Sequence, residues 1–258
     1  FGSKSVYNTA DSRHNTVAYD SSNNKVVIAF KDYTSSLQYG RAIVGTISGT
    51  SISFGSKVEL NSANTFPISA IYDPSSQKVV VAYQDYGNSY QGTVRVGTVS
   101  GTSISFGSEV LFDSSASDTI AMAYDSTNGK IVIGFANSFS PYRGKAVVGT
   151  VSGTSISFGT PVIFDSSARA EYVTPVYDPS TNRVVIAYRD GNNTDRGVAV
   201  VGEVSGTSIS FGSCNVVFDT NRIFTPTAVY DSANQKVVIG YNDSGNNYYG
   251  DRKSTRLN

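Results

Sequence analysis

Apolar and polar residues follow a pattern along this chain that returns about every 53 residues. In the second copy, residues 78–84 are apolar at nearly every position, which is typical of a strand buried on both faces. Residues 103–112 begin with Ser-Ile-Ser-Phe, and this alternation predicts a strand with one exposed face. Residues 70–72 and 93–100 complete a set of four short strands. No stretch has the apolar period of a helix.

The segments between these strands carry the residues that tight turns require. Asp73 and Pro74 begin the turn after the first strand, and Gly101-Thr102 joins the third strand to the fourth. Two-residue turns that contain glycine join antiparallel neighbours. Each copy therefore predicts a four-stranded antiparallel unit. A Tyr-Asp pair opens the first turn in five copies, at Tyr19, Tyr72, Tyr124, Tyr177 and Tyr230.

Four antiparallel strands in a repeat of this length resemble the blades of β-propeller proteins. The resemblance implies an all-β fold, a five-bladed β-propeller in which a strand that begins at Phe1 joins the C-terminal blade and closes the ring. The chain lacks the Trp-Asp pair of WD40 blades and the double glycine of kelch blades, so it indicates no characterised family. We expect one domain over residues 1–258. An open β-solenoid is the alternative, although its repeats are usually shorter.

The two ends of the chain interrupt the repeat. The amino end lies in the middle of a copy and looks truncated. Residues 251–258 stand where another Val-rich strand is due, and they resemble the translation of a sequencing-library adapter. We therefore expect residues 251–258 to be foreign to the natural protein, as in a sequence assembled from an environmental sample.

Composition narrows the range of partners. The chain has 20 acidic and 20 basic residues, a net charge of zero and a pI near 6.8, so it has no field that would attract nucleic acid. No segment is long and apolar enough to be a membrane-spanning helix. The single cysteine excludes an intramolecular disulfide and gives no information on the compartment.

The loops on one face of the predicted blades vary between copies, whereas the turns on the other face are nearly identical. A varied face on a repeated scaffold is where a unique site or interface is expected. Its tyrosines could stack on sugar rings or anchor a protein partner. We predict contacts with a ligand or partner at Tyr33, Tyr39, Tyr86, Tyr90, Tyr142, Tyr172, Tyr248 and Tyr249.

Two rings of polar residues recur on the same face. One follows the second strand, at Asp32, Asp85, Asn137, Asp190 and Asp243; the other follows the fourth strand, at Asn8, Asn61, Asp113, Asp165 and Asp219. Such oxygens could bind Ca²⁺ or sugar hydroxyls, but side chains that cap equivalent loops are the interpretation we favour. We expect no metal and no cofactor. Two sequons on this face make Asn192 and Asn242 candidate glycosylation sites.

Three functions are compatible with these features. Catalytic residues should break the repeat. Glu171 is an acid outside the repeat, on the varied face, but Glu59, Glu109 and Glu203 lie within repeat strands and have no evident partner, and His14 is expected in a solvated loop. We therefore expect no enzyme. The preferred hypothesis is an extracellular structural protein, a self-assembling subunit of a fibril or surface layer whose main partner is itself. The alternatives are a multivalent carbohydrate-binding propeller and a glycoside hydrolase.

Overall fold

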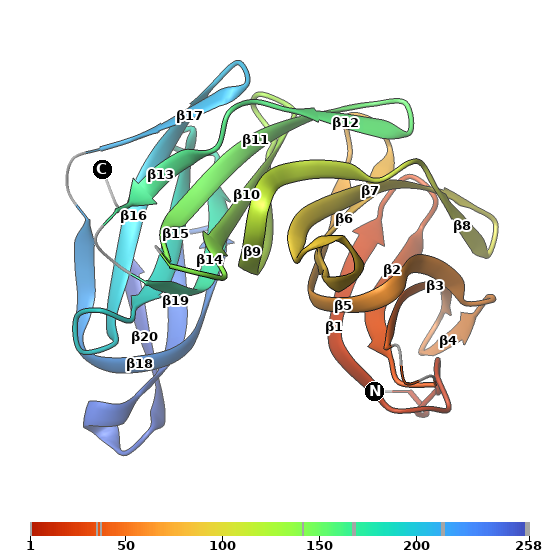
Figure 1. The fold of residues 1–258 in the computed structure, drawn as a ribbon. Coiled ribbons are helices and arrows are strands. Elements are labelled where there is room, and N and C mark those ends of the chain that lie inside the picture. Colours follow the sequence, from red (N-terminus) through yellow and green to blue (C-terminus); the bar gives the residue numbers. More distant parts are fainter. Residues whose placement is uncertain are drawn as a thin grey trace. The chain divides into compact units, whose positions relative to one another are not determined.

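The computed structural model describes residues 2–34, 36, 38–140, 142–166, 169–212 and 215–255. These residues form an all-β fold of antiparallel strands (Figure 1). Within the described ranges no helix is long and apolar enough to cross a membrane. The chain divides into two compact units, residues 1–116 with 151–157 and residues 117–150 with 158–258. The prediction of one domain over residues 1–258 is not tested by this division.

Unit 1 pairs its strands in the order β1-β2-β3-β5-β6-β7-β9, with β4 on β3 and β8 on β7. The bounds are β1 (Ser12–Asp20), β2 (Lys25–Asp32), β3 (Tyr39–Ser48), β4 (Ser51–Phe54), β5 (Val58–Asp73), β6 (Lys78–Asp85), the 3₁₀ turn η1 (Tyr86–Asn88), β7 (Gln91–Ser100), β8 (Ser103–Phe106) and β9 (Val110–Asp125). The second half of β9 belongs to unit 2.

Unit 2 continues from β9 through β10 and β11, and a second sheet runs in the order β14-β15-β16-β18-β19-β20. The bounds of the remaining elements are β10 (Lys130–Asn137), β11 (Gly144–Ser152), β12 (Ser155–Phe158), β13 (Val162–Asp165), β14 (Ala170–Asp178), β15 (Arg183–Asp190), β16 (Arg196–Ser205), β17 (Ser208–Phe211), β18 (Val216–Asp231), β19 (Lys236–Asp243), the 3₁₀ turn η2 (Ser244–Asn246) and β20 (Tyr249–Thr255). The end of β11 and most of β12, residues 151–157, belong to unit 1.

The predicted fourth strand is divided into two pieces. In the second repeat, β8 ends at Phe106, and the chain re-enters the sheet at Val110, where β9 pairs with β7. Gly107 lies in the gap, and its amide donates to the Val96 carbonyl at 2.9 Å. A side chain at Gly107 would overlap the carbonyl oxygen of Thr154, so glycine permits close approach of two repeats.

The first strand of a repeat is longer than its sequence predicts. β5 pairs with β3 near Val58 and with β6 near Asp73, so one strand serves two successive repeats. β9 and β18 do the same. In every repeat the pairing with the second strand slips by one residue, between Arg13 and Thr16 in β1 and between Glu171 and Thr174 in β14. Such bulges redirect the side chains beside them.

The second strands form the cores, as their apolar sequence predicts. In β6, Val79, Val80, Val81, Ala82 and Tyr83 are completely buried. β2 and β6 share a core cluster in unit 1, and β15 contributes to both clusters of unit 2. This burial holds the ends of the second strands at fixed positions, and the polar residues that follow them begin the varied loops.

The strand expected at the amino end is not formed by residues 2–11; Phe1 lies outside the described residues. Gly2 packs on Thr50 as Gly55 packs on Thr102, and the Tyr7 ring lies 5.1 Å from the Phe30 ring. Residues 2–11 therefore pack on the first repeat without forming a strand there.

The carboxyl end does take the place of a third strand. β20 pairs with β19 from Asp243↔Tyr249 to Val237↔Thr255. Asp251, Arg252 and Lys253 are exposed, whereas Ala42, Ile43 and Val44 of β3 are buried. Residues 256–258 lie outside the described residues.

Candidate ligand-binding sites

The polar ring after the second strands caps loops. Asp32, Asp85, Asp190 and Asp243 are at most 5% exposed. Each accepts the backbone amide two residues further on, from Thr34 (3.0 Å), Gly87 (2.8 Å), Asn192 (3.2 Å) and Gly245 (2.7 Å). This geometry confirms loop capping for these four residues. Asn137 is half-buried.

The two predicted rings meet in pairs. Asn8 Nδ2 donates to Asp32 at 3.1 Å, and Asn61 Nδ2 donates to Asp85 at 2.9 Å. Lys57 also bonds Asp32 at 3.0 Å. Burial on its own would raise the pKa of Asp32, but the hydrogen bonds from Thr34, Lys57 and Asn8 lower it to about 2. These contacts hold the ends of successive repeats together.

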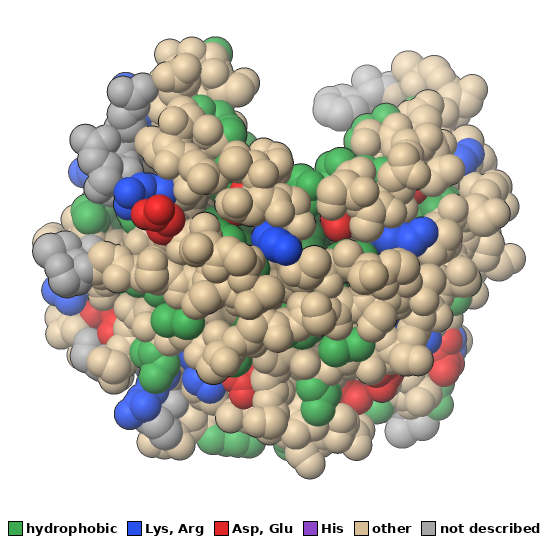
Figure 2. All heavy atoms as spheres, turned by 90° about the horizontal axis from the view of Figure 1, so that it is seen from above, with side chains coloured by type: hydrophobic (Ala, Val, Ile, Leu, Met, Phe, Trp, Pro, Cys, Tyr) green, Lys and Arg blue, Asp and Glu red, His purple; other side chains and the backbone are tan. Residues whose placement is uncertain are grey.

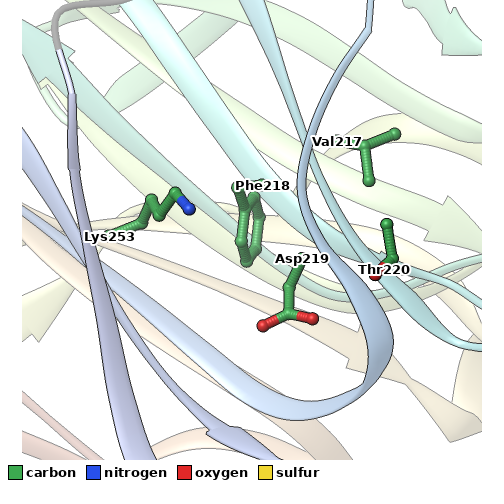
Figure 3. Close-up of a pocket in the computed structure, with 5 residues that line it drawn as sticks. All are labelled: Val217, Phe218, Asp219, Thr220 and Lys253. Carbon is green, nitrogen blue, oxygen red and sulfur yellow. The ribbon is translucent and has the colours of Figure 1, made fainter. Parts of the chain in front are cut away.

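In unit 2 the two rings bring carboxylates together. One oxygen from each of Asp219, Asp243 and Asp251 lies within 4.8 Å of the others. Burial raises the pKa of Tyr241, and its hydrogen bond to Asp219 raises it further. Asp219 also lines a pocket of about 310 Å³, with Val217, Phe218, Thr220 and Lys253 (Figure 3). None of the eight predicted contact tyrosines lines this pocket.

The predicted contact tyrosines fall into separate groups. Tyr86 and Tyr90 pack edge to face with ring centroids 4.7 Å apart, and Tyr39 lies 5.2 Å from the guanidinium of Arg41. Tyr249 is 64% exposed. The other four tyrosines, Tyr33, Tyr142, Tyr172 and Tyr248, belong to two clusters in which aromatic rings surround cations.

The first cluster is in unit 2 and centres on Arg189, the residue before Asp190 at the end of β15 (Figure 1). Arg189 is only 8% exposed. Its Nε donates to Glu171 Oε2 at 2.7 Å, and its Nη2 bonds the same oxygen. Nη1 is buried and has no hydrogen-bond partner among the described residues.

Two aromatic rings flank this guanidinium. The Arg189 Cζ lies 4.9 Å from the centroid of Tyr172 and 5.3 Å from that of Phe224, within the range of cation–π attraction. Tyr172 is 40% exposed, and Phe224 is partly buried. We call Glu171, Tyr172, Arg189 and Phe224 the Arg189 site.

A rim of charged and aromatic side chains surrounds the Arg189 site. Arg169 bonds Glu171 at 2.8 Å and lies 4.8 Å from the Tyr142 ring. Arg222 bonds Asp195 at 2.9 Å and lies 4.7 Å from the Phe224 ring, which also contacts Tyr248 at 5.9 Å. Tyr142 and Tyr248 are exposed. Donors, acceptors and ring faces therefore converge on one surface of unit 2.

The same position of the first repeat, in unit 1, is occupied by a second buried cation. Lys31 precedes Asp32 as Arg189 precedes Asp190, and it is 6% exposed. Its ammonium lies 5.2 Å from the Tyr33 ring and 5.8 Å from the Phe66 ring. Arg13 and His14 take the places of Glu171 and Tyr172, and His14 lies 4.0 Å from Phe66. We call Arg13, His14, Lys31, Tyr33 and Phe66 the Lys31 site.

In both sites, the bulge of the first strand sets the direction of a side chain that lies near the cation. His14 and Tyr172 are the equivalent residues of their bulges, and both have the left-handed backbone, with φ of 55° and 53°. This conformation is uncommon for residues other than glycine. The prediction that His14 lies in a loop was wrong, because it lies in β1 at this bulge, although it is exposed.

Sequence reasoning missed the two cations. Aligned by register, the residues before the capping ring are Lys31, Gln84, Ala136, Arg189 and Asn242, and a long cation stands out at two of these positions. Glu171 was noted as an acid outside the repeat, but its partner was not found. The missing step was a comparison of equivalent positions across repeats.

The two sequons differ in accessibility. Asn192 is exposed in the turn after β15. Asn242 lies within β19 and not in a loop, and its amide donates to the Tyr248 carbonyl. Glycosylation stays a prediction, and the geometry favours Asn192.

Charges on the described surface are dispersed. Figure 2 shows Lys and Arg beside Asp and Glu in small groups on one face, without a broad field of either sign. The net charge of the chain is zero.

No family model and no curated protein matches the sequence. Solved structures do share the fold. The SapL1 lectin in complex with α-methyl fucoside is 12% identical, with a TM-score of 0.56 over 95% of this chain and 76% of that one. AofleA from Arthrobotrys oligospora is 10% identical, with a TM-score of 0.61 over 94% and 68%. The exo-β-1,3-galactanase of Phanerochaete chrysosporium is 8% identical, with a TM-score of 0.59 over 91% and 57%. At these identities the likeness shows the fold alone.

Proposed function

We propose that this protein is a five-bladed β-propeller that binds carbohydrate through the Arg189 site, and that it acts outside the cell. Five copies of the Tyr-Asp repeat and the shared fold of a fucoside-binding lectin support the architecture and the class of ligand. The residues of the site supply the chemistry that a sugar requires.

A sugar ring presents an apolar C–H face and a set of hydroxyl groups that both donate and accept hydrogen bonds. Tyr172 and Phe224 offer ring faces for the apolar side. Glu171 offers a carboxylate to accept from hydroxyls, and Arg189 offers a fixed fork of donors. Arg169 and Asp195 extend the donors and acceptors to the rim.

The observation that carries this proposal is Arg189 Nη1, a buried donor without an acceptor among the described residues. A buried donor left unpaired costs about 1–3 kcal/mol. A ligand oxygen would remove this cost. The ring of Tyr172 is 40% exposed and lies between solvent and this guanidinium in the proposed complex, in which it turns to admit that oxygen.

Binding accounts for this geometry better than hydrolysis does. Glycoside hydrolysis uses a pair of carboxyl groups that exchange a proton and attack or activate water. Here both oxygens of Glu171 accept from arginine, Oε1 from Arg169 and Oε2 from Arg189. The carboxylate therefore serves as an acceptor that orients the guanidiniums. The self-assembling fibril subunit stays a prediction.

The test compares Arg189→Lys with the natural chain by calorimetric titration of α-methyl fucoside, α-methyl galactoside and α-methyl glucoside. Lysine fits this register, as Lys31 shows, but it lacks the planar fork. We expect at least one of these sugars to bind and Arg189→Lys to weaken it roughly tenfold or more. Lys236→Arg, at an exposed turn of β19, is the matched control. The proposal is contradicted if none of the three sugars binds, or if Arg189→Lys binds them as tightly as the natural chain does.

A further inference from the structure

The Lys31 site holds a buried cation that no acid balances. Lys31 is 94% buried, and among the described residues its ammonium contacts only the rings of Tyr33 and Phe66. In unit 2, the equivalent Arg189 is paired with Glu171. A buried charge is costly unless it is paired.

The residues around Lys31 add further positive charge. Arg13 replaces the acid of the Arg189 site and lies 4.7 Å from the Tyr33 ring. Asp11 bonds Arg13 at 2.9 Å, so the carboxylate of Asp11 is already paired with one of the two cations. The cluster of Asp11, Arg13 and Lys31 therefore carries a formal net charge of +1.

His14 adds a titratable group to this cluster. Burial lowers the pKa of His14, and the positive charges of Lys31 and Arg13 lower it further. Its ring packs on Phe66 at 4.0 Å, and Lys31 and Arg13 are the charged groups that act on it among the described residues, with Asp11 paired to Arg13. An anion bound here would oppose the repulsion from Lys31 and Arg13.

We propose that the Lys31 site binds the anionic group, a carboxylate or a sulfate, of an acidic sugar. Lys31 and Arg13 pair with the anion, His14 contributes an N–H donor, and the half-buried rings of Tyr33 and Phe66 contact the sugar ring. The inference extends the proposed carbohydrate binding to a second site of different charge preference. Apart from the class of ligand, it stands on unit 1 residues alone.

The single histidine of the chain makes the test direct, because one set of imidazole signals in an NMR spectrum reports on His14. The probes are methyl β-D-glucuronide, glucose 6-sulfate, the neutral methyl β-D-glucoside and inorganic sulfate. We expect the first two to shift the His14 signals, to raise its pKa, and to bind roughly tenfold or more tightly than the glucoside. Affinity should fall as salt is added.

Two variants assign the effect to Lys31. Lys31→Gln places the residue of the second repeat, Gln84, at this register, and it should remove the preference for anionic sugars and raise the pKa of His14 in the free protein. Lys236→Gln makes the same change of charge at an exposed turn and should change neither. If Lys31→Gln does not fold, the titration of His14 in the natural chain with the four probes decides.

The outcomes separate this inference from the proposed function. Equal binding of glucuronide and glucoside overturns the acidic-sugar site and leaves the Arg189 site standing. If inorganic sulfate shifts the His14 signals as much as the glucuronide does, the site recognises the anion alone, and recognition of a sugar is overturned. If anionic sugars shift the His14 signals but Arg189→Lys leaves the calorimetric titration of every neutral sugar unchanged, the Lys31 site is supported and the proposed function is contradicted.

Discussion

The Arg189 site and the Lys31 site share a register and differ in charge. In each, a cation precedes the capping aspartate of a second strand and lies beside a phenylalanine of the next repeat, Phe224 or Phe66. At the bulge, the Arg189 site has Glu171 and Tyr172, and the Lys31 site has Arg13 and His14 at the equivalent positions. The repeat therefore determines where the buried cation lies, and two bulge residues determine the charge around it.

The largest expected effect tests the pairing that distinguishes the sites. Glu171→Gln leaves the guanidinium of Arg189 buried without its carboxylate, and loss of one partner of a buried pair costs about 3 kcal/mol. Urea unfolding should show this loss of stability.

A double variant sharpens this result. Arg189→Gln combined with Glu171→Gln should recover much of the stability, because Gln84 already occupies this register in the second repeat. An additive double variant would mean that the two side chains do not depend on each other.

The second prediction concerns Asp32, which follows Lys31 in the chain and caps the next loop through its bond to the Thr34 amide. The pKa of Asp32 is about 2 in the folded protein against an ordinary 3.8, so its contribution to stability is present above about pH 4 and is lost as pH falls through 2. The shift corresponds to about 2 kcal/mol.

Urea unfolding between pH 7 and pH 2 should therefore show a steeper acid loss in the natural chain than in Asp32→Asn. Asp11→Asn, at an exposed residue of the same region, is the control. Identical slopes for the natural chain and Asp32→Asn would contradict the assignment.

The third prediction separates binding from stability at the Arg189 site. Tyr172→Ala removes an exposed ring and should weaken sugar binding roughly tenfold while the free energy of unfolding changes by less than about 1 kcal/mol. Tyr86→Ala removes an exposed tyrosine of another repeat and should leave binding unchanged. Equal losses of affinity in both variants would mean that Tyr172 makes no specific contact with the sugar.

The smallest effect is expected at the Lys31 site. Arg13→Glu supplies the acid that Glu171 supplies in unit 2, so Lys31 gains a partner and stability should rise by about 1 kcal/mol or less, because residue 13 is exposed. Preference for anionic sugars should disappear at the same time. A variant that keeps the anion preference would place the anion elsewhere.

The sequence predicts the scaffold better than the site for a physical reason. The apolar run from Val79 to Tyr83 recurs in every copy, and the glycine turns at Gly49 and Gly101 recur at Gly153 and Gly206, so the turns and the capping aspartates follow from local pattern. The positive φ at the first turn position matches the turns that join antiparallel strands.

The sites depend on contacts that local pattern does not contain. Arg189 meets Glu171 across a strand pair and Phe224 in the next repeat, 18 and 35 residues away in the chain. The slip between Glu171 and Thr174 decides that Tyr172 faces the guanidinium, and it is not visible in the alternation of residues. The split of the fourth strand at Gly107 depends likewise on Thr154 of the following repeat.

The most direct test of the central claim is a glycan array probed with the natural chain, Arg189→Lys and Lys31→Gln side by side. The account predicts that the natural chain binds both neutral and acidic glycans, that Arg189→Lys loses the neutral set, and that Lys31→Gln loses the acidic set. An array on which the folded natural chain binds no glycan, or on which the two variants bind as it does, would contradict it.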